Sequence, residues 1–250
     1  MSVRAQRNAL VWAAAASAAA QFVPSIVALG QWAPLRALPG GLCRWQGPGS
    51  SSKVALTFDD GPDPEGTPRV LDVLGELGLR ATFFVLGERV RDDPELVWEI
   101  ARRGHQLATH GDQHARHLLR TPAWARRDLD RAMEAMAALG HPPRWFRPPY
   151  GQATGATLAL ARAMGLETVL WSAWGREWVS PEPEEVAARI GRRLLPGAVV
   201  LLHDSDRFGR AGMWRAACDA LPLVASELHR RRLDAVTMDE LVACATAPVA

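Results

Sequence analysis

The sequence predicts an α/β fold with a mostly parallel β-sheet, arranged either as a barrel or as a doubly wound sheet. About seven short apolar runs alternate with longer segments of helical period from residue 53 onward, and this alternation is typical of parallel sheets. Polar side chains follow directly after several apolar runs, and in such sheets functional groups gather where the strands end. Hydrophobic residues make up 48% of the 250 residues, which is enough apolar material for one large domain or two small ones.

Residues 1–35 form an apolar N-terminal segment that we expect to lie outside the folded domain. No charged residue occurs between Asn8 and Leu35, and the stretch 9–32 is long enough to cross a bilayer, for which about 20 apolar residues suffice. A cleaved signal peptide with small residues at 18–20 before its cleavage site and a buried alanine-rich helix are the alternatives. The first two interpretations predict a membrane-anchored or a secreted protein whose downstream domain lies outside the cytoplasm.

The segment 36–52 is rich in Gly, Pro and Ser, and this composition predicts a linker. We therefore expect the folded domain to span 53–250. It begins with an apolar strand at 53–58. The helix at 67–77 follows, with Thr67 as its N-terminal cap.

The same alternation of strand and helix patterns continues to the end of the chain. Further strands are expected at 81–87, 105–110, 144–151, 167–174, 198–204 and 233–238. Further helices are expected at 93–104, 121–140, 155–165, 183–194 and 213–232. The last helix is expected in spite of Pro222, which lies in its interior.

The charge distribution argues against a nucleic-acid partner. The formal net charge is +2, and the basic residues are scattered along the chain rather than clustered. The sequence contains no pattern typical of a zinc finger, a basic zipper or an RNA-stacking module. We therefore expect no nucleic acid among its partners.

Two adjacent carboxylates, Asp59 and Asp60, end the first predicted strand. Neighbouring like charges disfavour each other's ionised form, so this pair requires a compensating group. A turn, a metal or a catalytic pair would each account for it.

His110 and His114 follow the strand at 105–110 and are four residues apart. On a helical turn two such histidines share a face and can bind one divalent metal; two surface histidines are the alternative. One Asp would complete a two-histidine, one-carboxylate set that leaves positions for a water molecule. The other Asp would then be free to accept a proton from that water.

Two further strand ends carry ionisable residues. Arg147 lies in a segment made rigid by two prolines, where it can pair with a carboxylate, and backbone N–H groups of such a turn can stabilise an oxyanion. His203 ends the most apolar strand and is suited to protonate a leaving group. A rigid surface loop and a structural histidine are the alternatives.

Taken together, these segments resemble the polysaccharide deacetylase family, the NodB-homology domain of carbohydrate esterases. TFDDGP at 57–62 matches the first motif, HGDQH at 110–114 the second, RPPYG at 147–151 the third and LLH at 201–203 the fifth. The similarity covers about residues 53–242. It implies a distorted (β/α) barrel of about seven strand–helix units, which is fewer than eight.

The resemblance also implies roles for the matched residues. Asp59 would be the general base and His203 the general acid. Arg147 would orient Asp59, and the Tyr150 backbone would contribute to an oxyanion hole.

The resemblance further implies a metal centre, usually zinc, and a substrate-binding surface around it. The metal ligands would be Asp60, His110 and His114. The matched motifs also place Pro149 and Leu201 at the substrate.

The fourth motif departs from the family pattern. The family usually has Asp directly before a Trp and a second Asp three residues earlier, whereas this chain has Glu177, Trp178 and Trp174 at these positions. In the family that Asp tunes the catalytic histidine and the Trp forms a wall of the acetyl pocket, so the resemblance implies these roles for Glu177, which keeps the charge on a longer side chain, and for Trp178. Trp174 adds an aromatic face that would either stack on a sugar or pack in the core. Nearby, His117 is expected to have a surface role, with an extra metal ligand as the alternative.

The implied reaction is hydrolysis of an N-acetyl group, sometimes an O-acetyl group, on an acetylated glycan such as peptidoglycan or a chitin-like polymer. A non-catalytic glycan-binding module on a degenerate fold is one alternative. A deformylase or deacetylase of a lipid-linked sugar is the other.

Overall fold

The structure is a computed structural model that describes residues 43–50 and 52–243. The expected N-terminal segment 1–35, with the stretch 9–32 predicted to associate with a membrane, lies outside the described residues. Among the helices in the described part of the chain, none has both the length and the apolar character needed to span a bilayer.

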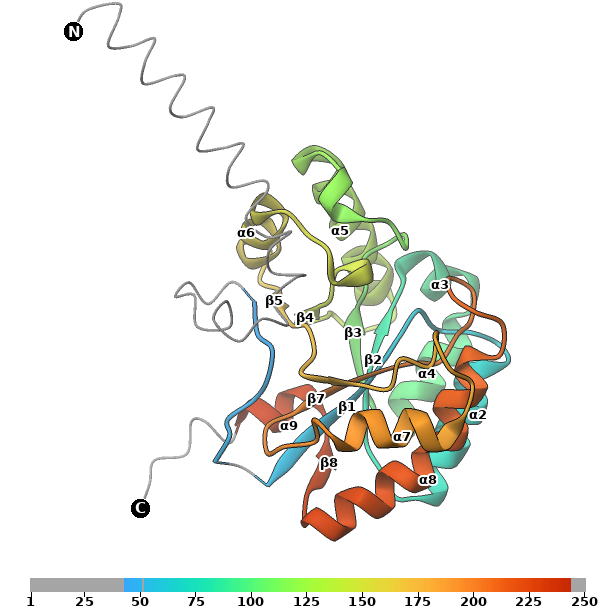
Figure 1. Cartoon of the computed structure of the whole chain (residues 1–250). Coiled ribbons are helices and arrows are strands. Elements are labelled where there is room, and N and C mark those ends of the chain that lie inside the picture. The colour runs from blue at the N-terminus through green and yellow to red at the C-terminus, as the bar shows by residue number, and fades with distance from the viewer. Residues whose placement is uncertain (1–42, 51, 244–250) are drawn as a thin grey trace, which may run out of the picture.

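Eight strands form one sheet in which every strand pairing is parallel. The strands are β1 (Lys53–Asp59), β2 (Thr82–Val85), β3 (Gln106–Thr109), β4 (Trp145–Phe146), β5 (Glu167–Thr168), β6 (Ala173–Trp174), β7 (Val199–His203) and β8 (Asp234–Val236). Their order is β5-β4-β3-β2-β1-β7-β6, and β8 pairs with the start of β1. The sheet curls into the distorted (β/α) barrel that the motifs implied, with β1 between β2 and β7 (Figure 1).

Helices surround the curled sheet (Figure 1). They are α2 (Gly66–Glu76), α3 (Gly87–Asp92), α4 (Pro94–Arg102), α5 (Pro122–Ala138), α6 (Gly155–Ala163), α7 (Pro183–Gly191), α8 (Met213–Arg231) and α9 (Met238–Ala243), together with the 3₁₀ turns η2 (His117–Leu119) and η3 (Pro149–Gly151). Sequence periodicity predicted most of these helices but missed α3 and α9. Both are only six residues long, which is too short for a helical period to be distinguished.

The alternation of side chains along β1 decides which of them face the site. Val54, Leu56 and Phe58 belong to the large apolar core between the sheet and the outer helices. Ala55 belongs to a second apolar cluster, which also contains Met238, Leu241 and Val242 of α9. Because successive side chains of a strand point to opposite faces, Asp59 continues the inward face of β1 at its carboxyl end.

The segment 167–174 was predicted as one strand, but the structure divides it between the two ends of the sheet. β5 pairs with β4 and β6 pairs with β7. The residues between β5 and β6 therefore connect the two edges of the sheet and belong to neither strand. The Arg147 guanidinium donates to the carbonyl oxygens of Val169 (3.3 Å) and Leu170 (3.1 Å). The segment that joins the two edges is therefore held by a side chain through its backbone carbonyls.

The described part of the predicted linker, residues 43–50, is packed against the sheet. Arg44 forms an isolated bridge with Val169, and Gln46 forms another with Ala198. Residues that precede the predicted domain start at 53 therefore also contact the sheet. A Gly- and Pro-rich composition disfavours regular structure but does not prevent single backbone hydrogen bonds to a neighbouring edge.

Candidate active site

The carboxyl ends of the central strands form one cavity of about 500 Å³. Asp59 and Asp60 reach it from β1, and His110 reaches it from the end of β3. His203 lies beside Asp59 because these two residues are register partners of β7 and β1. The predicted convergence of polar groups at this edge of the sheet is thus present.

The three predicted metal ligands come together in the cavity. His114 Nε2 lies 3.2 Å and His110 Nε2 lies 3.5 Å from Asp60 Oδ1, and one donor atom of each residue lies within 4.8 Å of the others. Two ligands at about 2.0–2.1 Å from a tetrahedral zinc ion are about 3.3 Å apart, so this donor set fits such an ion. Asp60 Oδ1 is buried without a hydrogen-bond donor among the described residues, as expected of an atom whose partner is a cation.

Burial alone would raise the pKa of the Asp60 carboxyl. The imidazoles of His110 and His114 that face the carboxyl, together with the charge of His203, outweigh this effect and hold the pKa below its usual range. Asp60 therefore carries the negative charge that a cation site requires.

The turn after β1 aims the two carboxylates in different directions. Asp60 has a φ of 80°, a left-handed conformation that Asp tolerates better than most residues. A side chain at Gly61 would collide with the Asp204 carboxylate, so the turn requires glycine there. Asp204 in turn accepts a hydrogen bond from Thr67 Oγ1 at 2.5 Å.

Asp59 is held by a fully buried arginine. Arg147 Nη1 donates to Asp59 Oδ1 at 2.6 Å and to Thr57 Oγ1 at 2.8 Å, and Arg147 has 0% exposure. Burial lowers the pKa of Arg147, and the charge of Asp59 opposes this shift. The guanidinium therefore fixes the orientation of Asp59, while Asp59 Oδ2 faces His110 Nε2 at 3.9 Å.

His203 is paired with Glu177 behind the cavity. His203 Nδ1 and Glu177 Oε1 are 2.7 Å apart, and Glu177 is fully buried. Burial lowers the pKa of His203, but the hydrogen bond and charge of Glu177 outweigh it and raise the pKa to about 9. The longer side chain of Glu177 fits because Gly175 leaves room; a Cβ there would lie 3.1 Å from Glu177 Oε2.

Aromatic side chains form much of the cavity wall. Trp178 meets His203 edge-on at 5.5 Å between ring centroids, and Tyr150 and Leu201 also line the cavity. Tyr150 adopts a left-handed backbone with a φ of 59°.

Sequence reasoning missed several wall residues, among them Trp171 and Phe208. Phe208 stacks on His114 at 4.1 Å, and Tyr150 contacts the same imidazole at 4.4 Å, so two rings hold His114 in place. Phe208 lies in a loop with no recognised motif, and only its position five residues after His203 placed it near the predicted site.

Three predicted residues lie elsewhere. Trp174 is buried and packs under the Arg193 guanidinium at 4.3 Å, and Pro149 is buried in the turn η3. Neither lines the cavity. His117 has 0% exposure, which contradicts the expected surface role, and its Nε2 lies 3.2 Å from Asp128 rather than at the metal donors.

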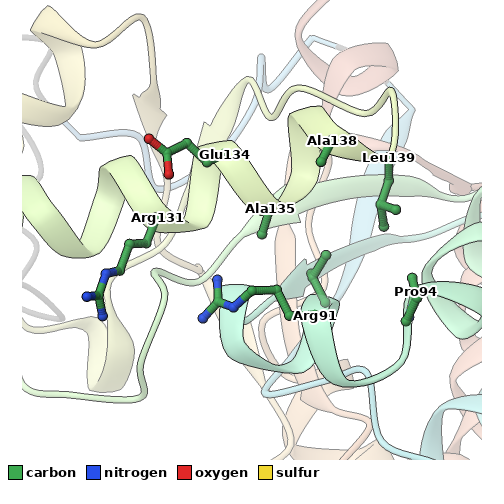
Figure 2. A pocket seen from close by; sticks show the side chains of 8 residues that line it. Arg91, Pro94, Arg131, Glu134, Ala135, Ala138 and Leu139 are labelled. Atoms are coloured by element: carbon green, nitrogen blue, oxygen red, sulfur yellow. The ribbon is translucent and has the colours of Figure 1, made fainter.

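A second cavity, of about 570 Å³, lies between α5 and the segment formed by α3 and α4. Figure 2 shows Arg131 and Glu134 of α5 together with Arg91 of α3 and Pro94 of α4. The remaining lining residues are aliphatic. None of the predicted site residues lines this cavity.

The chain is similar to characterised deacetylases. It is 33% identical over 207 residues to a peptidoglycan-N-acetylglucosamine deacetylase of Bacillus cereus, an alignment that covers 82% of this chain and 94% of that protein. It is 40% identical over 153 residues to a chitooligosaccharide deacetylase of Bradyrhizobium sp., covering 60% of this chain and 70% of that protein.

Solved structures show the same fold. A peptidoglycan N-acetylglucosamine deacetylase bound to a hydroxamate-type benzamide superposes with a TM-score of 0.76 at 30% identity, covering 81% of this chain and 93% of that one. A family 4 carbohydrate esterase from Streptomyces lividans in complex with acetate gives a TM-score of 0.66 at 30% identity, covering 73% and 91%. A pseudoenzyme from Bacillus anthracis gives 0.73 at 23% identity, covering 81% and 69%.

The sequence pattern of one family covers most of the residues of the site. The polysaccharide deacetylase pattern matches residues 46–169, which include Asp59, Asp60, His110, His114 and Arg147. The chain belongs to the polysaccharide deacetylase family.

Proposed function

We propose that this protein is a metal-dependent hydrolase that removes N-acetyl groups from a glycan containing N-acetylglucosamine. The observation that carries the proposal is the arrangement of a carboxylate held by Arg147 and a histidine held by Glu177 around one metal-type donor set. The family also contains a protein described as a pseudoenzyme, so membership alone does not determine catalysis. A module that only binds glycans does not require this base and this acid.

In the proposed mechanism each residue handles one part of an amide hydrolysis. Asp60, His110 and His114 would hold a divalent cation, for which zinc suits the donor types. When bound, this cation supplies a Lewis acid for the acetyl carbonyl and lowers the pKa of a water molecule.

Proton transfer in the mechanism is divided between two residues. Asp59 accepts a proton from the attacking water while the oxygen of that water bonds to the acetyl carbon. Arg147 keeps the Asp59 carboxylate oriented toward the cavity. His203 then donates its proton to the departing nitrogen as the C–N bond breaks, which yields acetate and a free amine. With a pKa of about 9, His203 carries that proton at neutral pH.

The cavity wall accounts for substrate positioning. Trp178 and Leu201 form an apolar surface beside His203, suitable for the acetyl methyl group. The Tyr150 backbone N–H is proposed to stabilise the developing oxyanion. Peptidoglycan and chitin-type oligosaccharides, which the relatives' names specify, are the substrates to test first.

We also propose that the domain acts outside the cytoplasm, attached through residues 9–32 or released after cleavage. The support is the uncharged N-terminal stretch and the location of peptidoglycan, the substrate named for a relative. Mass spectrometry of the mature protein from membrane and culture fractions tests this. An intact N-terminus in the cytoplasmic fraction would contradict it.

The function is tested by acetate release from peptidoglycan and chitooligosaccharides with added Zn²⁺. Asp59→Asn and His203→Ala should each lower the rate by about 10²–10⁴-fold while circular dichroism shows a folded protein. Asp130→Asn is the matched control, because Asp130 pairs on the surface with Arg126, and it should keep the wild-type rate. Full turnover by Asp59→Asn would refute the mechanism, and glycan binding without acetate release from any acetylated substrate would support a binding module.

A further inference from the structure

The turn that carries both histidine donors, residues 110–114, is anchored on its carbonyl side by α3. Gly87 N–H donates to Gly111 O at 2.9 Å, and Glu88 N–H donates to Asp112 O at 3.1 Å. The free N–H groups at the start of a helix thus find acceptors in the turn. This contact fixes one edge of the turn.

The amide side of the same turn is anchored by one carboxylate from α5. Asp128 Oδ2 accepts from Asp112 N–H and Asp128 Oδ1 accepts from Gln113 N–H, both at 3.1 Å. Gly111 allows this close approach, because it has a φ of 88° and a Cβ there would lie 2.7 Å from Asp128 Oδ2. Both oxygens of Asp128 are therefore engaged with the backbone between His110 and His114.

The imidazole of His117 contacts the Asp128 carboxylate. His117 Nε2 lies 3.2 Å from Asp128 Oδ2, and both side chains are almost completely buried. The His117 ring is enclosed by Trp124 at 5.2 Å and Phe146 at 5.7 Å between centroids. His117 is thus neither a surface residue nor a metal ligand, and its contact restricts the rotation of the Asp128 carboxylate.

We propose that Asp128, supported by His117, is a positioning residue that fixes the separation of His110 and His114 and so raises the affinity of the metal site. A helical carboxylate that accepts two successive amides sets the conformation of the residues between the ligands, as groups behind metal ligands commonly do. The inference rests on the proposed metal site and extends it to residues that touch neither metal nor substrate.

The test is Zn²⁺ affinity of the full-length protein, measured by competition with a chromophoric chelator. Asp128→Asn keeps the side-chain volume but presents an NH₂ group to one of the two amides. We expect its Zn²⁺ dissociation constant to rise about 10–100-fold. Asp130→Asn, two residues along the same helix and paired with Arg126 on the surface, should leave the constant unchanged.

A second pair of variants keeps the test independent of whether Asp128→Asn folds. His117→Leu removes the polar contact with Asp128 and should weaken Zn²⁺ binding, whereas His117→Gln places a side-chain amide near the carboxylate and should restore it. The melting temperature of the metal-free protein is recorded in parallel. A variant set that changes this temperature but keeps wild-type Zn²⁺ affinity would show a purely structural role and overturn the inference.

The outcomes also separate this inference from the proposed function. Wild-type protein that binds no Zn²⁺ would refute the metal site and the inference together. Wild-type protein that binds Zn²⁺ with the same affinity as Asp128→Asn and His117→Leu would refute the inference alone.

Discussion

Neighbouring residues of the same type have different environments in this site. Asp59 is paired with the buried Arg147, whereas Asp60 turns toward two imidazoles. The repulsion between adjacent carboxylates is offset because each has its own cationic or hydrogen-bonding partner. Removing one partner of a buried pair generally costs about 3–5 kcal/mol, so Arg147 supports stability as well as orientation.

Glu177 is expected to set the upper pH limit of activity. It raises the pKa of His203 to about 9, so the acid form required for catalysis is lost only as the pH rises through that value. In Glu177→Gln the charge is absent and burial still lowers the pKa of His203. The alkaline limb of kcat/KM should therefore move to lower pH, by about 1–3 units for a lost charge at contact distance.

Glu177→Asp is the control for this shift, because it keeps a carboxylate near His203. Its alkaline limb should lie between those of the wild type and Glu177→Gln. An unchanged pH profile in Glu177→Gln would show that another group governs the protonation of His203.

At the scale of elements, several short parallel strands are combined with long outer helices. β4, β5 and β6 have two residues each, and α5 and α8 have 17 and 19. Thr121 caps α5 by accepting from Trp124 N–H at 3.2 Å. The long helices therefore supply much of the apolar core around the sheet. The ends of the strands carry the polar side chains of the site.

Pro222 in α8 is a specific element-level test. It lies inside the helix with its side chain exposed, so it removes an interior backbone hydrogen bond without contributing to the core. Pro222→Ala should raise the free energy of unfolding by about 1–2 kcal/mol, since the proline's smaller entropy in the unfolded chain offsets part of the gain. Urea denaturation measures this, and acetate release should not change; a lower midpoint would mean that the proline is matched to a required bend.

At the scale of the whole molecule, the site joins segments that are far apart in the chain. The metal donors come from Asp60 and from the turn 110–114, so metal binding should couple to global stability. At a free Zn²⁺ concentration 100 times the dissociation constant, the free energy of unfolding should rise by about 2.7 kcal/mol. Thermal unfolding with Zn²⁺ and then with a chelator measures this, and a His114→Ala protein should show no Zn²⁺-dependent shift.

The barrel also depends on the segment 43–50. Arg44 N–H donates to Thr168 O and Leu170 N–H donates to Arg44 O, both at 2.8 Å, while Gly47 N–H donates to Gly197 O at 2.7 Å. Each such bond contributes about 0.5–1.5 kcal/mol. A chain that begins at residue 53 should therefore be less stable than one that begins at residue 43, by about 2–4 kcal/mol in urea denaturation; equal stabilities would mean that the segment is only a linker.

Much of the architecture and of the site could be predicted from the sequence. The alternation of apolar runs and helical segments determined the parallel α/β fold, and the ends of those runs indicated Asp59, His110, Arg147 and His203. The predicted parallel fold is confirmed, and these four residues lie close together because a parallel sheet places all of its carboxyl ends at one edge. The spacing of His110 and His114 likewise follows from local geometry.

The tertiary structure decided what local pattern could not express. It divided the segment 167–174 between two edges of the sheet, with Arg147 donating to the carbonyl oxygens of Val169 and Leu170 between them. It also buried Trp174 away from the cavity and placed His117 against Asp128. Such outcomes depend on contacts between residues distant in the chain. The space available and the hydrogen-bonding groups nearby, rather than residue type alone, determine which side chains line the cavity.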